Sequence, residues 1–186
     1  MKKVVLLTVG IVVVAELIVG MAWVYSGTVD VSAVRPEGNL TRWFLASVKD
    51  QSIRSRASAI TVPSLEDSLL IVKGFDHYNE MCASCHGGPG RDAEELAKGL
   101  NPSAPLLAQA AGKRTAAEMF VIIKEGIRMT GMPAWGTTHD DSAIWSMVAF
   151  VQRLPSMTPE KYNEFERPKH GGEETEQQHD HHELHH

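Results

Sequence analysis

The sequence predicts an all-α protein with a membrane-spanning helix at its N-terminus. A long apolar segment opens the chain, and later segments show helical apolar spacing without the alternation of half-buried strands. Of the 186 residues, 43% are hydrophobic and 22% charged, which is typical of one modest globular domain with extensions. The formal net charge is -5, and no basic stripe with interleaved aromatics is present, so we expect no nucleic-acid partner.

Residues 1–25 form the predicted membrane anchor. After two lysines, the apolar run 4–25 carries a single charge, Glu16, and about 20 apolar residues suffice to cross a bilayer as a helix. The lysines should stay cytoplasmic, which places the rest of the chain outside. A cleaved signal peptide is the alternative. The length of the run and the interfacial position of Trp23 and Tyr25 favour an uncleaved anchor.

Residues 26–63 read as a spacer with one amphipathic helix. Leu40, Trp43, Phe44 and Val48 recur at helical spacing, with basic residues distributed around them. Such a helix can lie on a lipid surface or pack on the following domain. Packing on the domain is the commoner use of an apolar stripe and is our expectation.

Residues 64–162 are predicted to form one helical domain. Thr115 and Glu118 stand at capping-box spacing, and Gly99 is a typical stop after a helix. Prolines exclude regular structure from the loops between the helices. The expected helices cover 65–86, 92–98, 115–129 and 142–154.

The two cysteines of the chain, Cys82 and Cys85, are three residues apart and are followed directly by His86. A thioredoxin-like dithiol belongs near a βαβ pattern, which is absent. A structural zinc needs four ligands, and a second ligand pair is missing from the folded part. In Cys-x-x-Cys-His, the cysteines form thioethers to the two vinyl groups of a haem, and the histidine is the proximal iron ligand. The motif therefore predicts one covalently bound haem c.

Met132 is the predicted second axial ligand. It lies in the loop Thr-Gly-Met-Pro, where proline fixes the backbone and glycine allows a close approach to the porphyrin. The chain has eight methionines, and Met129 is the main competitor, although the helical pattern extends to it. His139 is a weaker alternative that would give a bis-histidine haem, and a position at the start of a helix suits it better.

With these motifs, the region 65–162 resembles a class I c-type cytochrome of the small bacterial type with an N-terminal membrane anchor. The resemblance implies a cytochrome c fold, in which about four to five short helices surround one covalently bound haem. It implies that Gly74 and Tyr78 on the first helix cross the last helix at 144–150. It also implies that the carbonyl of Pro102 or Pro105 receives the proximal histidine's Nδ1 hydrogen. Trp135 is then expected to pack on the haem edge or to bind a propionate.

This ligand set leaves the iron no open position, so the chain is expected to be a one-electron carrier rather than an enzyme. Because covalent haem is attached outside the bacterial cytoplasm, we expect a single-pass protein of the inner membrane with its haem domain on the periplasmic side. Its partners would be redox proteins. The alternatives are a haem subunit of a larger oxidoreductase, or a sensor or peroxidase whose methionine ligand dissociates.

Residues 163–186 form an acidic, histidine-rich tail that is expected to be disordered. Imidazole together with carboxylate suits copper, nickel or zinc, which makes metal binding by the tail a second hypothesis.

Overall fold

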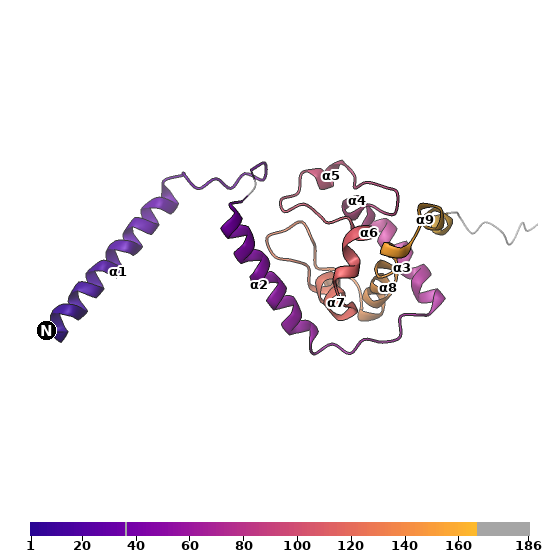
Figure 1. Cartoon of the computed structure of the whole chain (residues 1–186), viewed down its shortest axis with the longest axis horizontal. Helices are drawn as coiled ribbons and strands as arrows, with labels where there is room; N and C mark the ends of the chain where they lie inside the picture. Colours follow the sequence, from indigo (N-terminus) through magenta and orange to yellow (C-terminus); the bar gives the residue numbers. More distant parts are fainter. Residues whose placement is uncertain (36, 167–186) are drawn as a thin grey trace, which may run out of the picture.

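The computed structural model describes residues 1–35 and 37–166, and within these ranges it contains helices and loops but no strand (Figure 1). The all-α prediction is therefore confirmed for the described part of the chain. Helix α1 stands apart from a rounded body that the other helices form (Figure 1). The helices are α1 (Lys2–Tyr25), α2 (Asn39–Ala57), α3 (Ser68–Met81), α4 (Ala83–His86), α5 (Glu95–Lys98), α6 (Leu107–Ala110), α7 (Ala116–Glu125), α8 (Asp141–Val151) and α9 (Pro159–Glu166).

Helix α1 has no buried residue. Among the described helices, it is the one that is long and apolar enough to cross a membrane, judged by length and composition. Its bounds fit the expected anchor at 1–25.

The crossing of α3 and α8 forms the centre of the core. A Cβ atom placed on Gly74 would lie 2.0 Å from the carbonyl oxygen of Ser146 and 2.9 Å from the Cβ of Phe150. Tyr78, one turn later, is fully buried, and its ring centroid lies 5.3 Å from that of Phe150. The expected crossing through Gly74 and Tyr78 is confirmed.

The first helix of the domain is shorter than the predicted range 65–86. It begins at Ser68 because the side chain of Asp67 accepts a hydrogen bond from the Leu69 N–H at 2.9 Å and so caps the N-terminus. It ends at Met81, and the backbone bends at Cys82, whose φ is -112°. The chain then forms the separate turn α4, so Cys82 lies at the break and Cys85 lies within α4.

Helix α7 has the predicted capping box between Thr115 and Glu118 but ends at Glu125, not at 129. Gly126 adopts φ 65°, and a Cβ there would lie 2.7 Å from the carbonyl carbon of Pro133. The helix therefore stops where the returning loop crosses it, at a position that only glycine fills without strain. The apolar periodicity continues past this point and does not reveal the stop.

The other differences concern helix ends and short elements. Helix α8 begins at Asp141 and ends at Val151, not at 154. Helix α5 covers only 95–98 of the predicted 92–98, and α6 follows the proline-rich loop, where no helix was predicted. Helix α9 was also not predicted and extends beyond residue 162. Its Tyr162 is 1% exposed and packs against Phe75, with ring centroids 5.6 Å apart. The half-buried Phe165 also packs against Phe75, with ring centroids 5.3 Å apart. Helix α9 thus closes one side of the core with two aromatics, which are a weak sequence signal in an otherwise polar segment.

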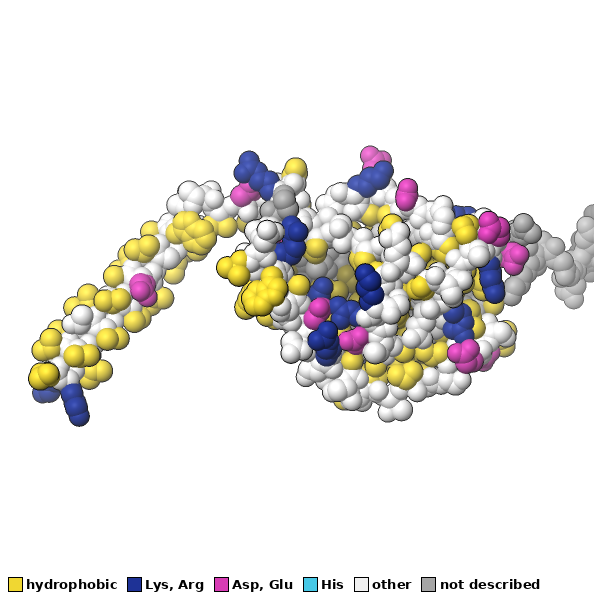
Figure 2. Space-filling model, in the orientation of Figure 1, with side chains coloured by type: hydrophobic (Ala, Val, Ile, Leu, Met, Phe, Trp, Pro, Cys, Tyr) yellow, Lys and Arg dark blue, Asp and Glu magenta, His cyan; other side chains and the backbone are white. Residues whose placement is uncertain are grey.

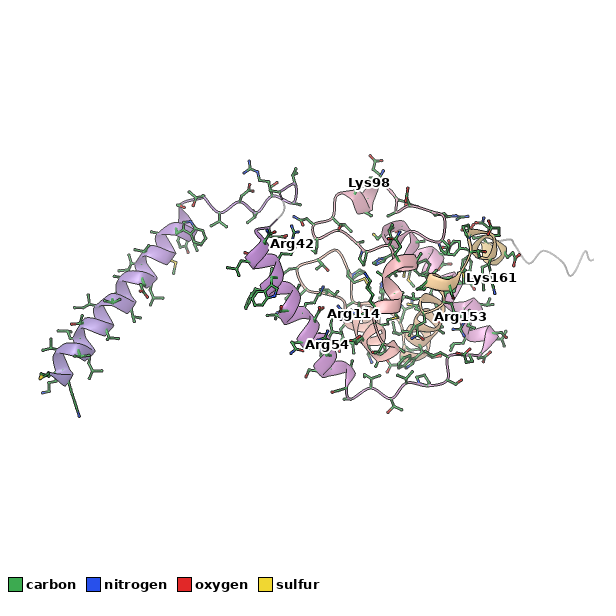
Figure 3. The ribbon with its side chains drawn as sticks, in the orientation of Figure 1. Arg42, Arg54, Lys98, Arg114, Arg153 and Lys161 are labelled. Carbon is green, nitrogen blue, oxygen red and sulfur yellow. The ribbon has the colours of Figure 1, made fainter. Side chains whose placement is uncertain are left out.

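The second half of α2 packs on the rounded body at α7, where Ile53 and Ala57 are buried. The expectation that the apolar stripe at 40–48 packs on the domain is wrong, because these side chains are 52–76% exposed. Arg54 and Arg114 lie close together at this junction (Figure 3), and both approach the carboxylate of Glu118, at 3.7 and 3.8 Å. Arg114 also donates to Asp50 at 2.6 Å.

Desolvation tends to raise the pKa of Asp50. The hydrogen bond and charge of Arg114, helped by Lys49 and Arg54, outweigh this effect, so the pKa lies below 3.8. The Asp50 carboxylate therefore stays charged at neutral pH and helps to hold α2 in place.

Candidate haem site

The Cys-x-x-Cys-His motif spans the break between α3 and α4. Cys82 is 8% exposed, Cys85 is half-buried, and both are free thiols. Burial raises the pKa of Cys82 to about 12, and the neighbouring Cys85 adds to this. Cys82 therefore stays protonated at neutral pH, which does not suit a redox dithiol with a reactive thiolate.

His86 ends α4, and its ring is anchored by a backbone carbonyl. The Nδ1 atom lies 2.8 Å from the carbonyl oxygen of Pro105. Since a carbonyl only accepts, Nδ1 carries the proton, and Nε2 keeps its lone pair for a metal. Of the two prolines that the resemblance suggested, Pro105 makes this contact.

Burial lowers the pKa of His86, and the hydrogen bond to Pro105 opposes this in part. The imidazole is accordingly neutral at pH 7, which is the form that binds a metal.

The turn after His86 is held by one hydrogen bond and one close backbone approach that the sequence did not reveal. The hydroxyl of Tyr78 donates to the carbonyl oxygen of Gly87 at 2.7 Å, inside the core. Gly87 has φ 64°, and a Cβ there would lie 2.5 Å from the carbonyl oxygen of Arg91. The glycine pair after the motif was the available signal for this tight turn.

Arg91 connects the loop after His86 to helix α9. It forms an ion pair with Glu166, donates to Asn163 at 2.7 Å, and lies over the ring of Tyr162 at 5.4 Å. The segment that follows His86 is thus fixed from both sides.

Met132 lies in the loop between α7 and α8, half-buried against the core. Its N–H donates to the Thr130 hydroxyl at 3.1 Å, and its carbonyl accepts from the Ile127 N–H at 3.2 Å. A Cβ on Gly131 would lie 2.7 Å from Leu100, so this loop packs closely on the loop that precedes Pro105. The backbone of Met132 is therefore held in a defined position.

The position of Met129 does not favour it as an iron ligand. The sequence pattern placed it at the end of a helix, which is wrong, because the helix stops at Glu125. Met129 instead lies in the loop with φ 60° and is 90% exposed. A side chain this exposed makes little contact with the rest of the protein.

Trp135 is half-buried and packs against the core. The ring of His139 lies 5.7 Å from it and 5.3 Å from that of His77. Asp140, not His139, caps α8, because its carboxylate accepts from the Ala143 N–H at 2.8 Å. The role of Trp135 at a haem edge stays a prediction.

The donor set fits haem c. It offers two free thiols at the Cys-x-x-Cys spacing, one neutral imidazole with an anchored Nδ1, and one thioether in a fixed loop. Within residues 1–35 and 37–166, no three His, Cys, Asp or Glu side chains are placed to hold a metal ion together. The predicted copper, nickel or zinc site of the tail involves histidines at 170–186, outside the described residues, and stays a prediction.

Comparisons with known proteins agree with this assignment. Residues 70–151 match the family model described as cytochrome c oxidase, cbb3-type, subunit III. The Cbb3-type cytochrome c oxidase subunit CcoP of Azospirillum sp. (strain B510) is 32% identical over 129 residues, which are 66% of this chain and 40% of that protein. The chain therefore spans about two fifths of the length of this curated relative. No solved structure matches the chain significantly.

Proposed function

Because this chain is a c-type cytochrome with a haem c domain behind an apolar N-terminal helix, we propose that it carries single electrons with His86 and Met132 as axial iron ligands. The hydrogen bond between His86 Nδ1 and Pro105 carries this proposal. It orients one imidazole beside two free thiols and leaves Nε2 for the metal.

Haem c bound at this motif supplies a one-electron couple between Fe(II) and Fe(III). The residues of this chain contribute orientation and exclusion of water. Pro105 fixes the imidazole, the Ile127–Met132 hydrogen bond fixes the thioether loop, and the buried core excludes solvent behind Cys82. A thioether ligand and apolar surroundings both favour the ferrous state and raise the potential.

The match to cbb3-type oxidase subunits favours a second, narrower role. The matched relative is a subunit of an oxidase, so the electrons of this chain would pass to or from a larger membrane-bound oxidoreductase. In this role the chain itself performs no catalytic step. The haem domain would lie on the periplasmic side, with the lysines before α1 in the cytoplasm.

Carbon monoxide binding to the reduced protein distinguishes an electron carrier from a ligand sensor or a peroxidase. If Met132 remains bound, the reduced full-length protein in native conditions should show no change in its optical spectrum under carbon monoxide. Stoichiometric binding at neutral pH would favour the sensor or peroxidase and overturn the carrier assignment, although it would leave the haem c assignment intact.

A further inference from the structure

Helix α2 has a second apolar face, opposite the face that packs on α7. Leu40, Phe44 and Val48 follow one another at four-residue spacing and are 76%, 57% and 52% exposed. Trp43 and Leu45 flank them at 65% and 54% exposure. These five residues form the outer face of α2, which Figure 2 shows as hydrophobic surface on the side of the helix turned away from the rounded body.

The outer face is apolar only in the first half of the helix. Beyond Val48, the same side of α2 carries Gln51, Ser52 and Ser55, all exposed. The buried contacts with α7, by Ile53 and Ala57, lie in the second half. The haem domain therefore covers only the second half of α2, and the apolar outer face of the first half stays exposed.

The apolar half of α2 is the half nearest to the membrane helix along the chain. An extended chain gains at most about 3.6 Å per residue, so the tether 26–38 keeps the start of α2 within about 50 Å of the end of α1. The first turn of α2 has no acidic residue, and Arg42 is exposed there. Exposed aromatic and aliphatic side chains with a cation beside them are the composition of helices that lie in a lipid interface.

We propose that the outer face of α2 lies in the surface of the lipid bilayer that α1 crosses. The haem domain, fixed to the other end of α2 by Ile53 and Ala57 and by the ion pairs of Arg54 and Arg114, is then held beside the membrane in one orientation. It does not swing freely on its tether. The haem would exchange electrons with a partner close to the membrane surface.

The test measures the reaction of single engineered cysteines with a charged, water-soluble maleimide. The haem-loaded full-length protein is placed in nanodiscs of phosphatidylethanolamine and phosphatidylglycerol at one copy per disc, and both native cysteines are consumed as thioethers. Phe44→Cys reports on the outer face. Ser55→Cys reports on the same side of α2 beyond the apolar half, and Val12→Cys reports on α1.

Phe44→Cys is expected to react about tenfold more slowly than Ser55→Cys, because the reactive thiolate is disfavoured away from water. Equal rates would place the outer face in water and overturn the proposal. If Phe44→Cys reacts slowly in protein-rich vesicles but rapidly in single-copy discs, the outer face contacts a second copy of the chain. That result also overturns the proposal. Rapid reaction of Val12→Cys would show that α1 does not span the bilayer, and the inference, which depends on that span, would fail for this separate reason.

Discussion

Replacing Gly74 with alanine should destabilise the haem domain by about 3 kcal/mol or more, because the added methyl meets backbone. The new Cβ would lie 2.0 Å from the carbonyl oxygen of Ser146, far inside contact distance, and α8 is too tightly packed to move away. Alanine gains about 1 kcal/mol of helix propensity over glycine, which is too little to offset this clash. Denaturant unfolding of the haem-loaded protein, followed by far-UV circular dichroism, measures the loss.

Gly99→Ala is the matched control for this substitution. Gly99 has φ -85°, which any residue adopts, and the nearest atom to an added Cβ is the Leu96 carbonyl oxygen at 3.7 Å, an ordinary contact. Its free energy of unfolding should stay within about 0.5 kcal/mol of the wild type. If Gly74→Ala were as stable as Gly99→Ala, the close crossing of α3 and α8 would be wrong.

Replacing Met132 with alanine should remove one axial ligand and lower the reduction potential by a large part of the roughly 0.8 V that axial ligands span. The thioether favours Fe(II), and its loss leaves the site to water or another weak ligand. Redox titration of the full-length protein gives the potential, and the optical spectrum of the oxidised protein shows whether the sulfur-to-iron charge-transfer band is present.

Met129→Ala provides the control, since this side chain is 90% exposed and lies in the same loop three residues earlier. It should leave the potential and the band unchanged. Survival of the band in Met132→Ala, or its loss in Met129→Ala, would refute the assignment of Met132 as the ligand.

Much of the proposed site could be predicted from the sequence because its chemistry is local. Cys82, Cys85 and His86 are neighbours in the chain, so their spacing alone determines how they meet a haem. Met132 was distinguished by the glycine and proline beside it. The comparisons with cbb3-type oxidase subunits then support the c-type cytochrome assignment from the same region of the chain.

The features that the sequence did not reveal depend on contacts between distant segments. Helix α7 stops at Glu125 because a loop several residues later crosses Gly126, and no local pattern reports that crossing. Helix α9 carries few apolar residues, and its order depends on Tyr162 entering a core built elsewhere. Helix α2 carries apolar residues in both halves, and only the packing shows that the domain covers Ile53 and Ala57 and leaves 40–48 exposed.

The pyridine haemochrome spectrum of the full-length membrane-bound protein tests the central claim most directly, because the position of its α-band reports how many haem vinyl groups have become thioethers. The wild type should show a c-type spectrum with both vinyls saturated, at one haem per chain. Cys82→Ser and Cys85→Ser should each shift the band to that of a haem with one free vinyl. A wild-type protein without haem, or with haem that acid-acetone extracts, would contradict covalent attachment at Cys82 and Cys85 and return the pair to a thiol or zinc role.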